Sequence, residues 1–250
     1  MAWRPAQGVR DSNIKKKAKV ASIITQMQTL YSLNPYLSPV EVIADQLQAL
    51  DSTQKQHLLS LCEKSFSRVD LRKLESIRVA TAKILVALVP DSLDVIKKWI
   101  NMKSGKYVYE VHFSLFCFLG HIPELPNGKE VAAQMLSLIE HYLLQVTSKT
   151  AYAAWMAGDL LGDHWQLKEA ISLLVKTAKG ARFVAGRKGA LHGLAHVLDN
   201  LEEIHSPDSI NFKKKITILL QQISESDRSR EARKDAQMIL ENGGCSCRKT

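Results

Sequence analysis

Apolar residues recur at helical spacing in four segments of the chain. The longest stripe consists of Val131, Met135, Leu138, Ile139, Tyr142 and Val146. The other three stripes lie within residues 95–100, 167–178 and 212–223. A single apolar face is typical of a helix that its neighbours cover on one side only. Each of these segments therefore predicts an amphipathic helix.

The segment that precedes each amphipathic helix is apolar or small on nearly every side. Residues 111–119 (VHFSLFCFL) and 151–161 (AYAAWMAGDLL) are the clearest examples. A helix of this kind, called an enclosed helix below, must be covered on both flanks. The chain thus alternates an enclosed helix with an amphipathic one. Stacked helical hairpins need this alternation, because each pair leaves an open face that the next pair closes.

The remaining pattern also favours helices over strands. All seven prolines lie between the periodic segments, where they are expected to break helices. The β-branched residues occur inside segments of helical period, and no Asn-Gly or Asp-Gly pair joins two alternating runs. We therefore predict an all-α fold, with further helices at 14–33, 39–50 and 53–68.

The enclosed helices repeat when they are aligned on their last leucine. These leucines are Leu85, Leu119, Leu161, Leu194 and Leu240, which are 34, 42, 33 and 46 residues apart. Such steps scatter around the length of one helical-hairpin repeat. Glycines at 186, 189 and 193 lie inside a predicted helix, where each costs about 1 kcal/mol relative to alanine. Close contact with a neighbouring helix is the expected compensation.

The aligned segments resemble the first helix of HEAT repeats, which has a basic residue second, small residues in the middle and a final leucine that glycine often follows. The matching residues are Arg78, Arg187 and Arg233 at the basic position, Ala82, Gly158, Ala190, Gly193 and Ala236 in the middle, and Gly120 and Gly162 after the leucine. His112 and Ala154 depart from the basic position. The resemblance covers about 71–241 and implies a HEAT-like α-solenoid of stacked antiparallel helix pairs.

This pattern predicts one solenoid domain over 14–241, between a basic flexible tail at 1–13 and a cysteine-containing flexible tail at 242–250. The four cysteines fit neither a disulfide framework nor a four-ligand zinc spacing, and they suit a reducing compartment. No apolar run approaches the roughly eighteen residues that cross a bilayer. We therefore expect no membrane insertion and a cytoplasmic or nuclear location. The lysines at 15–17 and 19 are either a nuclear import signal or the basic start of the first helix.

A search for catalytic groups returns only isolated candidates. The chain has no G-x-G-x-x-G, no phosphate-binding P-loop and no H-E-x-x-H. His192 and His196 share a helix face with Asp199 close by, a spacing that permits a metal site, although buried hydrogen-bonded histidines are the commoner case. We accordingly predict no enzyme activity, no cofactor and no metal.

Asp159 is the most unusual polar position, because it lies within the very apolar segment around Trp155. A buried carboxylate must be paired or protonated, and the structural interpretation is a bond to a loop or an arginine. DNA alkylation-repair glycosylases of the AlkD kind are HEAT-like proteins that place tryptophans and an aspartate against DNA. The paired-tryptophan motif of that family is absent here, so a glycosylase-like enzyme is the third hypothesis. Trp155 itself is expected in the core.

The net charge of +9 points to a polyanionic partner such as an acidic protein surface or nucleic acid. We predict a protein-binding scaffold or adaptor in a larger complex, with side chains of the amphipathic helices lining a concave, basic surface. The predicted partner-binding residues are Lys97, Lys98, Lys176, Lys179, Arg182, Arg187, Lys188, Lys213, Lys214 and Lys215. The alternative is nucleic-acid binding through the phosphate backbone, which aromatic residues beside these charges would favour.

Overall fold

A computed structural model describes residues 39–48, 50–145, 151–165, 168–202 and 207–245. The described residues are helical and contain no strand, which confirms the all-α prediction. The predicted helix at 14–33 and the predicted tail at 1–13 lie outside them, as does most of the predicted tail at 242–250. Within the same residues, no helix is long and apolar enough to span a membrane.

The helices follow one another through short connections. They are α2 (Val40–Gln48), α3 (Ser52–Ser67), α4 (Val69–Arg72), α5 (Glu75–Ala87), α6 (Leu93–Ile100), α7 (Val108–Leu119), the 3₁₀ turn η1 (Ile122–Glu124), α8 (Gly128–Gln145), α9 (Ala151–Asp159), the π-helical turn η3 (Leu160–His164), α10 (Lys168–Gly180), α11 (Val184–Glu202), α12 (Pro207–Ser226) and α13 (Arg230–Asn242). Local chemistry sets some of these bounds. Asp51 and Gln54 form a reciprocal capping box at the start of α3, and α13 ends at Gly243, whose φ of 72° suits glycine.

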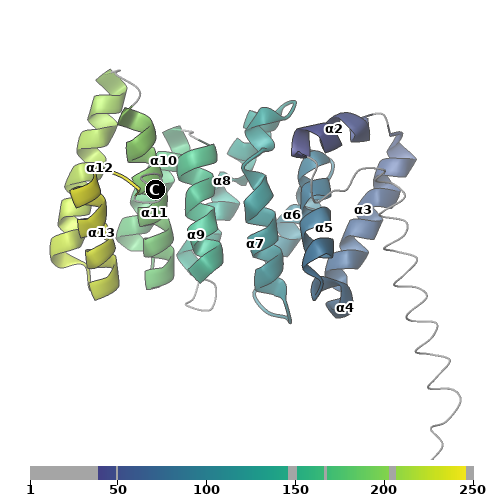
Figure 1. Ribbon diagram of the computed structural model, residues 1–250, viewed down its shortest axis with the longest axis horizontal. Helices are drawn as coiled ribbons and strands as arrows, with labels where there is room; N and C mark the ends of the chain where they lie inside the picture. The colour runs from purple at the N-terminus through teal and green to yellow at the C-terminus, as the bar shows by residue number, and fades with distance from the viewer. Residues whose placement is uncertain (1–38, 49, 146–150, 166–167, 203–206, 246–250) are drawn as a thin grey trace, which may run out of the picture.

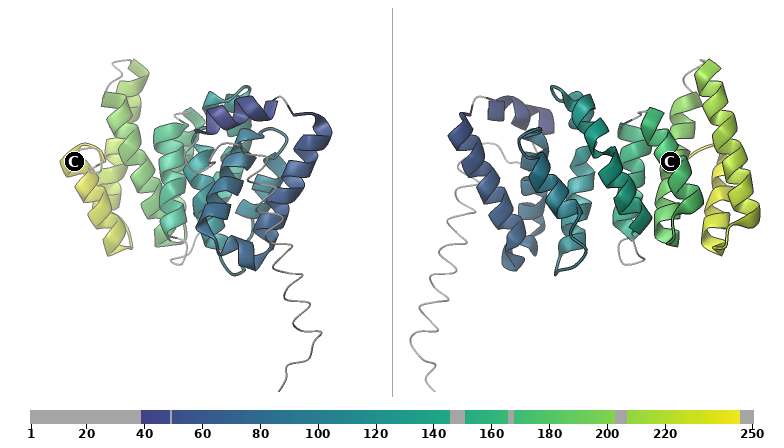
Figure 2. Two further views of the ribbon diagram at one scale, coloured as in Figure 1. Left: turned by 45° about the vertical axis from the view of Figure 1, so that its right-hand side comes forward. Right: turned by 180° about the vertical axis from the view of Figure 1, so that it is seen from behind.

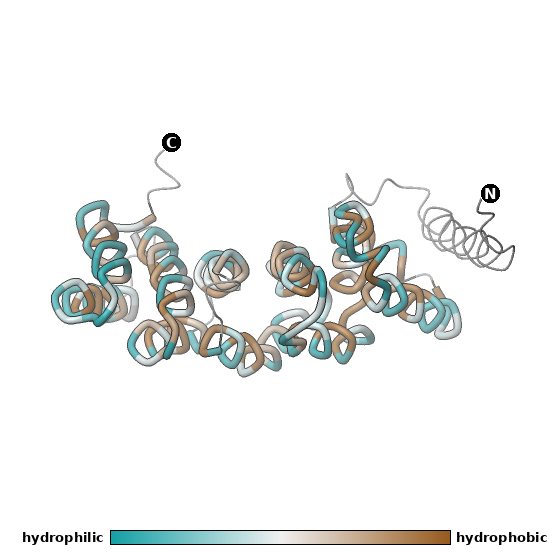
Figure 3. Tube along the Cα trace, turned by 90° about the horizontal axis from the view of Figure 1, so that it is seen from below, coloured by the Kyte–Doolittle hydropathy of each residue, from teal (hydrophilic) through white to brown (hydrophobic). Residues whose placement is uncertain are grey.

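The helices from α5 onward pack in two rows. The helices α5, α7, α9, α11 and α13 each contact the next and form the inner row, while α6, α8, α10 and α12 form the outer row in the same way. Figure 1 faces the inner row, and the right-hand view of Figure 2 shows the outer row from behind. The rows curve together into a shallow arc, and α5, α7, α9, α11 and α13 lie on its hollow side (Figure 3).

The inner row consists of the helices that the sequence marks as enclosed. Four of the five aligned leucines, Leu85, Leu119, Leu161 and Leu194, are buried completely. Leu240 in α13, the last described helix of this row, is half-buried and packs against the core. One continuous cluster of buried apolar side chains runs from Val40 to Cys245 and joins the two rows.

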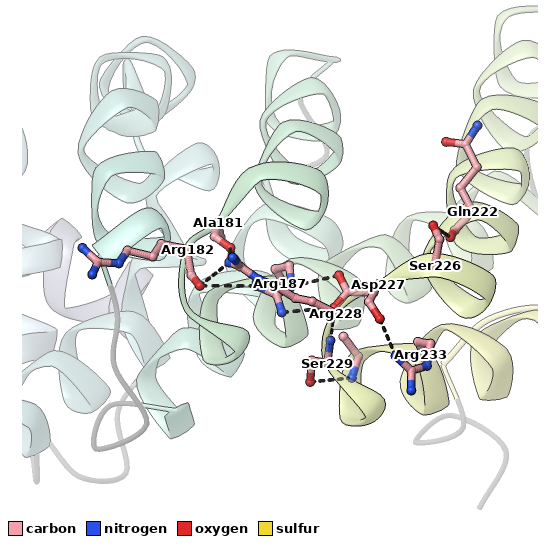
Figure 4. A network of polar contacts seen from close by, with 10 residues as sticks. Ala181, Arg182, Arg187, Gln222, Ser226, Asp227, Arg228, Ser229 and Arg233 are labelled. Carbon is pink, nitrogen blue, oxygen red and sulfur yellow. Dashed lines mark hydrogen bonds and ion pairs between the residues drawn. The ribbon is translucent and has the colours of Figure 1, made fainter.

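An arginine recurs at the start of three inner-row helices and performs the same task in each. The Arg78 guanidinium donates to the carbonyls of Arg72 and Lys73, at 2.6 and 3.1 Å. Arg187 donates to the carbonyl of Ala181 at 2.8 Å, and Arg233 to that of Asp227 at 2.5 Å (Figure 4). The carbonyls of Arg72, Ala181 and Asp227 each lie six residues before their arginine, at the end of the preceding element, where helical carbonyls lack partners.

His112 replaces the arginine in α7 and reaches a similar carbonyl. Its Nε2 lies 2.8 Å from the carbonyl oxygen of Trp99, near the end of α6, and its Nδ1 lies 3.2 Å from the Tyr142 hydroxyl. Burial lowers the pKa of His112 to about 4, so the ring is neutral at pH 7. His112 therefore preserves the contact with the preceding helix that an arginine makes elsewhere in the row.

Glycines bring α9 and α11 into direct backbone contact. A Cβ at Gly189 would lie 2.3 Å from the carbonyl oxygen of Ala154, and one at Gly158 only 2.0 Å from that of Gly189. A Cβ at Gly162 would meet the carbonyl oxygen of Gly193 at 2.1 Å. The predicted close packing at these helix glycines is confirmed. Because no side chain separates the two backbones, short polar side chains on α9 can reach those on α11.

Candidate groove on the inner row

A hollow of about 520 Å³ opens on the inner row between α9, α11 and α13. Its walls include Tyr152 and Trp155 from α9, His192 from α11 and Met238 from α13. The exposed fractions are 68 % for Tyr152 and 41 % for both Trp155 and Met238. Large apolar side chains that surround a hollow while still in contact with water are typical of binding surfaces.

Aromatic rings continue along the inner row on both sides of Trp155. The ring centroids of Phe113 and Tyr152 are 5.7 Å apart, those of Tyr152 and Trp155 are 6.0 Å apart, and those of Trp155 and His192 are 4.3 Å apart. Tyr152 also lines a second hollow of about 490 Å³ between α5, α7 and α9. The two hollows and the rings between them, from Phe113 to His192, are called the aromatic groove below.

The exposure of Trp155 contradicts the expectation that it lies in the core. The residues of α9 that face the neighbouring helices are Ala153, Ala154, Ala157 and Gly158, all of them buried. Their small size permits the close crossing with α11, and Trp155 faces the groove instead. A segment that is apolar on every side does not reveal which of its sides meets solvent.

Two histidines of α11 converge on Asp159 at the end of α9. His192 Nε2 lies 2.6 Å from Asp159 Oδ1, and His196 Nε2 lies 3.0 Å from the same oxygen. Burial alone would raise the pKa of Asp159, but hydrogen bonds and charge from both imidazoles lower it well below the usual range. The carboxylate is therefore ionised, and the expected partner, a loop or an arginine, is replaced by a pair of histidines.

The fold around Asp159 exposes one side of this cluster. The side chains of His192, His196 and Asp159 are 12 %, 8 % and 24 % exposed. The π-helical turn η3 begins directly after Asp159, and turns of this type are frequent at functional sites. His192 lines the groove, so solutes can reach the cluster from there.

The histidines and Asp159 stand out separately in the sequence, yet only the structure brings them together. Asp199, the carboxylate expected beside the two histidines, instead accepts hydrogen bonds from the backbone N–H of Cys245 at 3.1 and 3.2 Å. The carboxylate that meets the histidines comes from another helix. Spacing along one chain segment could not reveal that contact.

The predicted partner-binding residues do not gather on the hollow side of the arc. The lysines at 97, 98, 176, 179, 213, 214 and 215 belong to α6, α10 and α12 of the outer row. Lys98 pairs with Glu63 at 2.8 Å and Lys176 with Glu140 at 2.5 Å. Arg182 is exposed in the connection after α10, where its guanidinium lies 5.4 Å from the ring centroid of Phe183.

The two basic residues of α11 have different environments, and one corrects the prediction. Arg187 is buried, with only 3 % of its side chain exposed, and forms an ion pair with Asp227. It cannot contact a partner, because its guanidinium is used within the fold. Lys188 does line the aromatic groove, where its Nζ lies 3.4 Å from Glu231 and 3.5 Å from Asp235. Negative side chains thus balance the positive charge at this hollow.

Comparison of the chain with protein-family models, with curated proteins and with solved structures finds no match.

Proposed function

We propose that the protein is a HEAT-like α-solenoid that acts as a non-enzymatic scaffold or adaptor and binds an apolar segment of a partner protein in the aromatic groove. The repeated arginine contacts at the helix starts and the two helix rows support the repeat architecture. The observation that carries the binding proposal is the exposure of Tyr152, Trp155 and Met238 around one hollow.

The composition of the groove favours a protein segment as the ligand. Trp and Tyr are the side chains most often found as energetic anchors at protein interfaces, and Met adapts its shape to a partner. A segment with one or two apolar side chains would fill the hollow between α9, α11 and α13. Basic residues flanking that segment would face Glu231 and Asp235, which line the same hollow.

The same groove is less suited to nucleic acid. Phosphate binding needs an excess of lysine and arginine beside the stacking rings. Here Lys188 lines the hollow together with Glu231 and Asp235. A glycosylase-like reaction would need a carboxylate that faces the substrate, whereas Asp159 Oδ1 lies against two imidazoles. The acidic partner predicted from the net charge would have to contact the outer row, and that prediction stays open.

The test compares how much partner protein is recovered with two variants. The side chains replaced in both are exposed to solvent. Replacing both Tyr152 and Trp155 by alanine should reduce the affinity for a specific partner by about 30-fold or more for each anchor lost, since anchors of this type contribute about 2 kcal/mol or more each. Ile218→Ala, which removes a side chain 44 % exposed on α12, should leave recovery unchanged. Quantitative affinity purification with circular dichroism of each variant measures both outcomes.

Two results would contradict the proposal. One is equal recovery of every partner by the Tyr152→Ala/Trp155→Ala protein and by the wild type. The other is sub-micromolar binding of arbitrary DNA duplexes at physiological salt that falls when Lys213, Lys214 and Lys215 are changed to glutamate. The second result would favour the nucleic-acid alternative, because phosphate contacts are lost together with their lysines.

A further inference from the structure

The cluster at Asp159 brings one imidazole nitrogen from each of His192 and His196 within 3.0 Å of the same carboxylate oxygen. The two imidazoles come from residues one turn apart on α11, a spacing that puts both rings on the same helix face. The third atom is a carboxylate oxygen from α9, held opposite them by the glycine contacts between the two helices. We propose that Asp159, His192 and His196 form a binding site for a divalent transition-metal ion of the zinc class.

The two nitrogen–oxygen distances in the cluster are close to the ligand–ligand distances of a zinc site. With zinc–ligand bonds of about 2.0–2.2 Å and tetrahedral angles, neighbouring ligand atoms lie about 3.3 Å apart. The Nε2–Oδ1 distances are 2.6 Å for His192 and 3.0 Å for His196. Each contact therefore has to lengthen by less than about 1 Å to admit the ion. A metal ion bound between these atoms needs both Nε2 atoms deprotonated, so any proton that they carry is released to solvent on binding.

The ligand chemistry selects the class of metal. Two neutral imidazoles and one carboxylate suit Zn²⁺, Co²⁺ and similar ions, whereas Ca²⁺ and Mg²⁺ prefer sites made entirely of oxygen. Three protein ligands leave one tetrahedral position open, and the adjoining groove can supply water to it.

Cys245 adjoins the cluster but is not counted among the ligands. Its sulfur and one ring nitrogen from each of His192 and His196 all lie within 4.8 Å of one another. Cys245 is disulfide-bonded, which differs from the reduced cysteines expected from the sequence, and a disulfide sulfur is not the thiolate that binds metal. A second group, Glu41, His121 and Glu124, also gathers potential ligands, but it lies far along the fold near α2. A variant of this second group therefore serves as a control for metal binding at the Asp159 cluster.

The site is independent of the proposed scaffold function, and its test uses the metal ion alone. The full-length protein, freed of metal by chelation and kept without reductant, is titrated with Zn²⁺ in equilibrium dialysis. We expect one ion per chain with a dissociation constant below about 10 µM. Bound Zn²⁺ should also raise the midpoint of thermal unfolding, because the ion binds only the folded cluster. Co²⁺ should give the visible absorption bands of a tetrahedral site.

Four variants decide which residues hold the ion. Asp159→Asn and His196→Gln keep the size and hydrogen-bonding capacity of the side chains, and each should weaken Zn²⁺ binding by at least about 10- to 100-fold. Cys245→Ser and His121→Gln should bind like the wild type. Circular dichroism shows which variants fold; should His196→Gln fail to fold, His192→Gln replaces it, because its side chain lies nearer the groove.

The proposal is overturned if the wild-type protein binds Zn²⁺ only with a dissociation constant above about 10 µM. It is equally overturned if Asp159→Asn and the histidine variant bind as tightly as the wild type, or if binding disappears in His121→Gln alone. Unchanged partner recovery by the Tyr152→Ala/Trp155→Ala protein, with Zn²⁺ binding intact, would count against the scaffold proposal and leave the metal site standing.

Discussion

Helix α11 contacts two aspartates from other parts of the chain, and their surroundings differ. At its N-terminal end, Asp227 faces Arg187, with Nε–Oδ2 at 3.0 Å and Nη2–Oδ1 at 3.1 Å. Nearer its middle, Asp159 faces His192 and His196 through a single oxygen. The first arrangement is a two-point match between a permanent cation and a carboxylate. The second joins one carboxylate oxygen to two imidazole rings, without a two-point match.

Burial separates the two aspartates further. The side chains of Arg187 and Asp227 are 3 % and 9 % exposed, and the same guanidinium also holds the carbonyl of Ala181 at the end of α10 (Figure 4). Asp159 is 24 % exposed and lies beside the groove. A buried and fully matched pair stabilises one arrangement of helices. In a partly exposed cluster, a ligand can replace one of the contacts between side chains. Losing that contact destabilises the folded protein less than losing a buried ion pair.

The largest expected effect follows from removing the buried carboxylate. Asp227→Ala leaves the Arg187 charge buried without its partner and should lower the free energy of unfolding by about 3–5 kcal/mol. Asp159→Ala should cost less, about 1–2 kcal/mol, because the carboxylate is 24 % exposed and its removal leaves no permanent charge buried without a partner. Urea unfolding of both variants measures the difference. Equal losses would remove the distinction between the two aspartates.

A smaller effect is expected from the glycine contact that positions Asp159. The Cβ of Gly189→Ala would lie 2.3 Å from the backbone oxygen of Ala154, so α9 and α11 must separate at a cost of about 1–3 kcal/mol. Gly180→Ala is the control, because a Cβ there meets nothing within 4 Å. Its higher helix propensity should stabilise the protein by about 0.5–1 kcal/mol. Thermal unfolding that shifts in the same direction for both variants would contradict this explanation.

The smallest effect on stability is expected at Trp155. Because Trp155 is 41 % exposed, Trp155→Ala should cost below about 1.5 kcal/mol while it removes the central ring of the groove. Trp165 is the matched control, since its ring is buried and its Nε1 donates to the carbonyl of Leu119 at 3.0 Å. Trp165→Ala should cost about 3–5 kcal/mol. Similar unfolding midpoints for the two variants would show that Trp155 also belongs to the core.

Features that depend on residues close together in the chain could be predicted from the sequence. The period of apolar positions identified the helices, and the aligned leucines from Leu85 to Leu194 identified the positions that are buried completely in the inner row. The glycines of α11 indicated a close helix contact, which the backbone distances confirm. These predictions succeeded because helical periodicity, helix breaking and the space beside a glycine are local properties.

Only the tertiary structure decided which side of each helix meets solvent and which polar groups meet each other. The sequence did not reveal that Trp155 faces the groove, that Arg187 is buried against Asp227, or that Asp159 lies between two histidines of α11. Each outcome depends on how one helix is rotated and shifted against another. That arrangement is set by the packing of the whole row, where a small residue such as Gly189 determines how closely two distant segments approach.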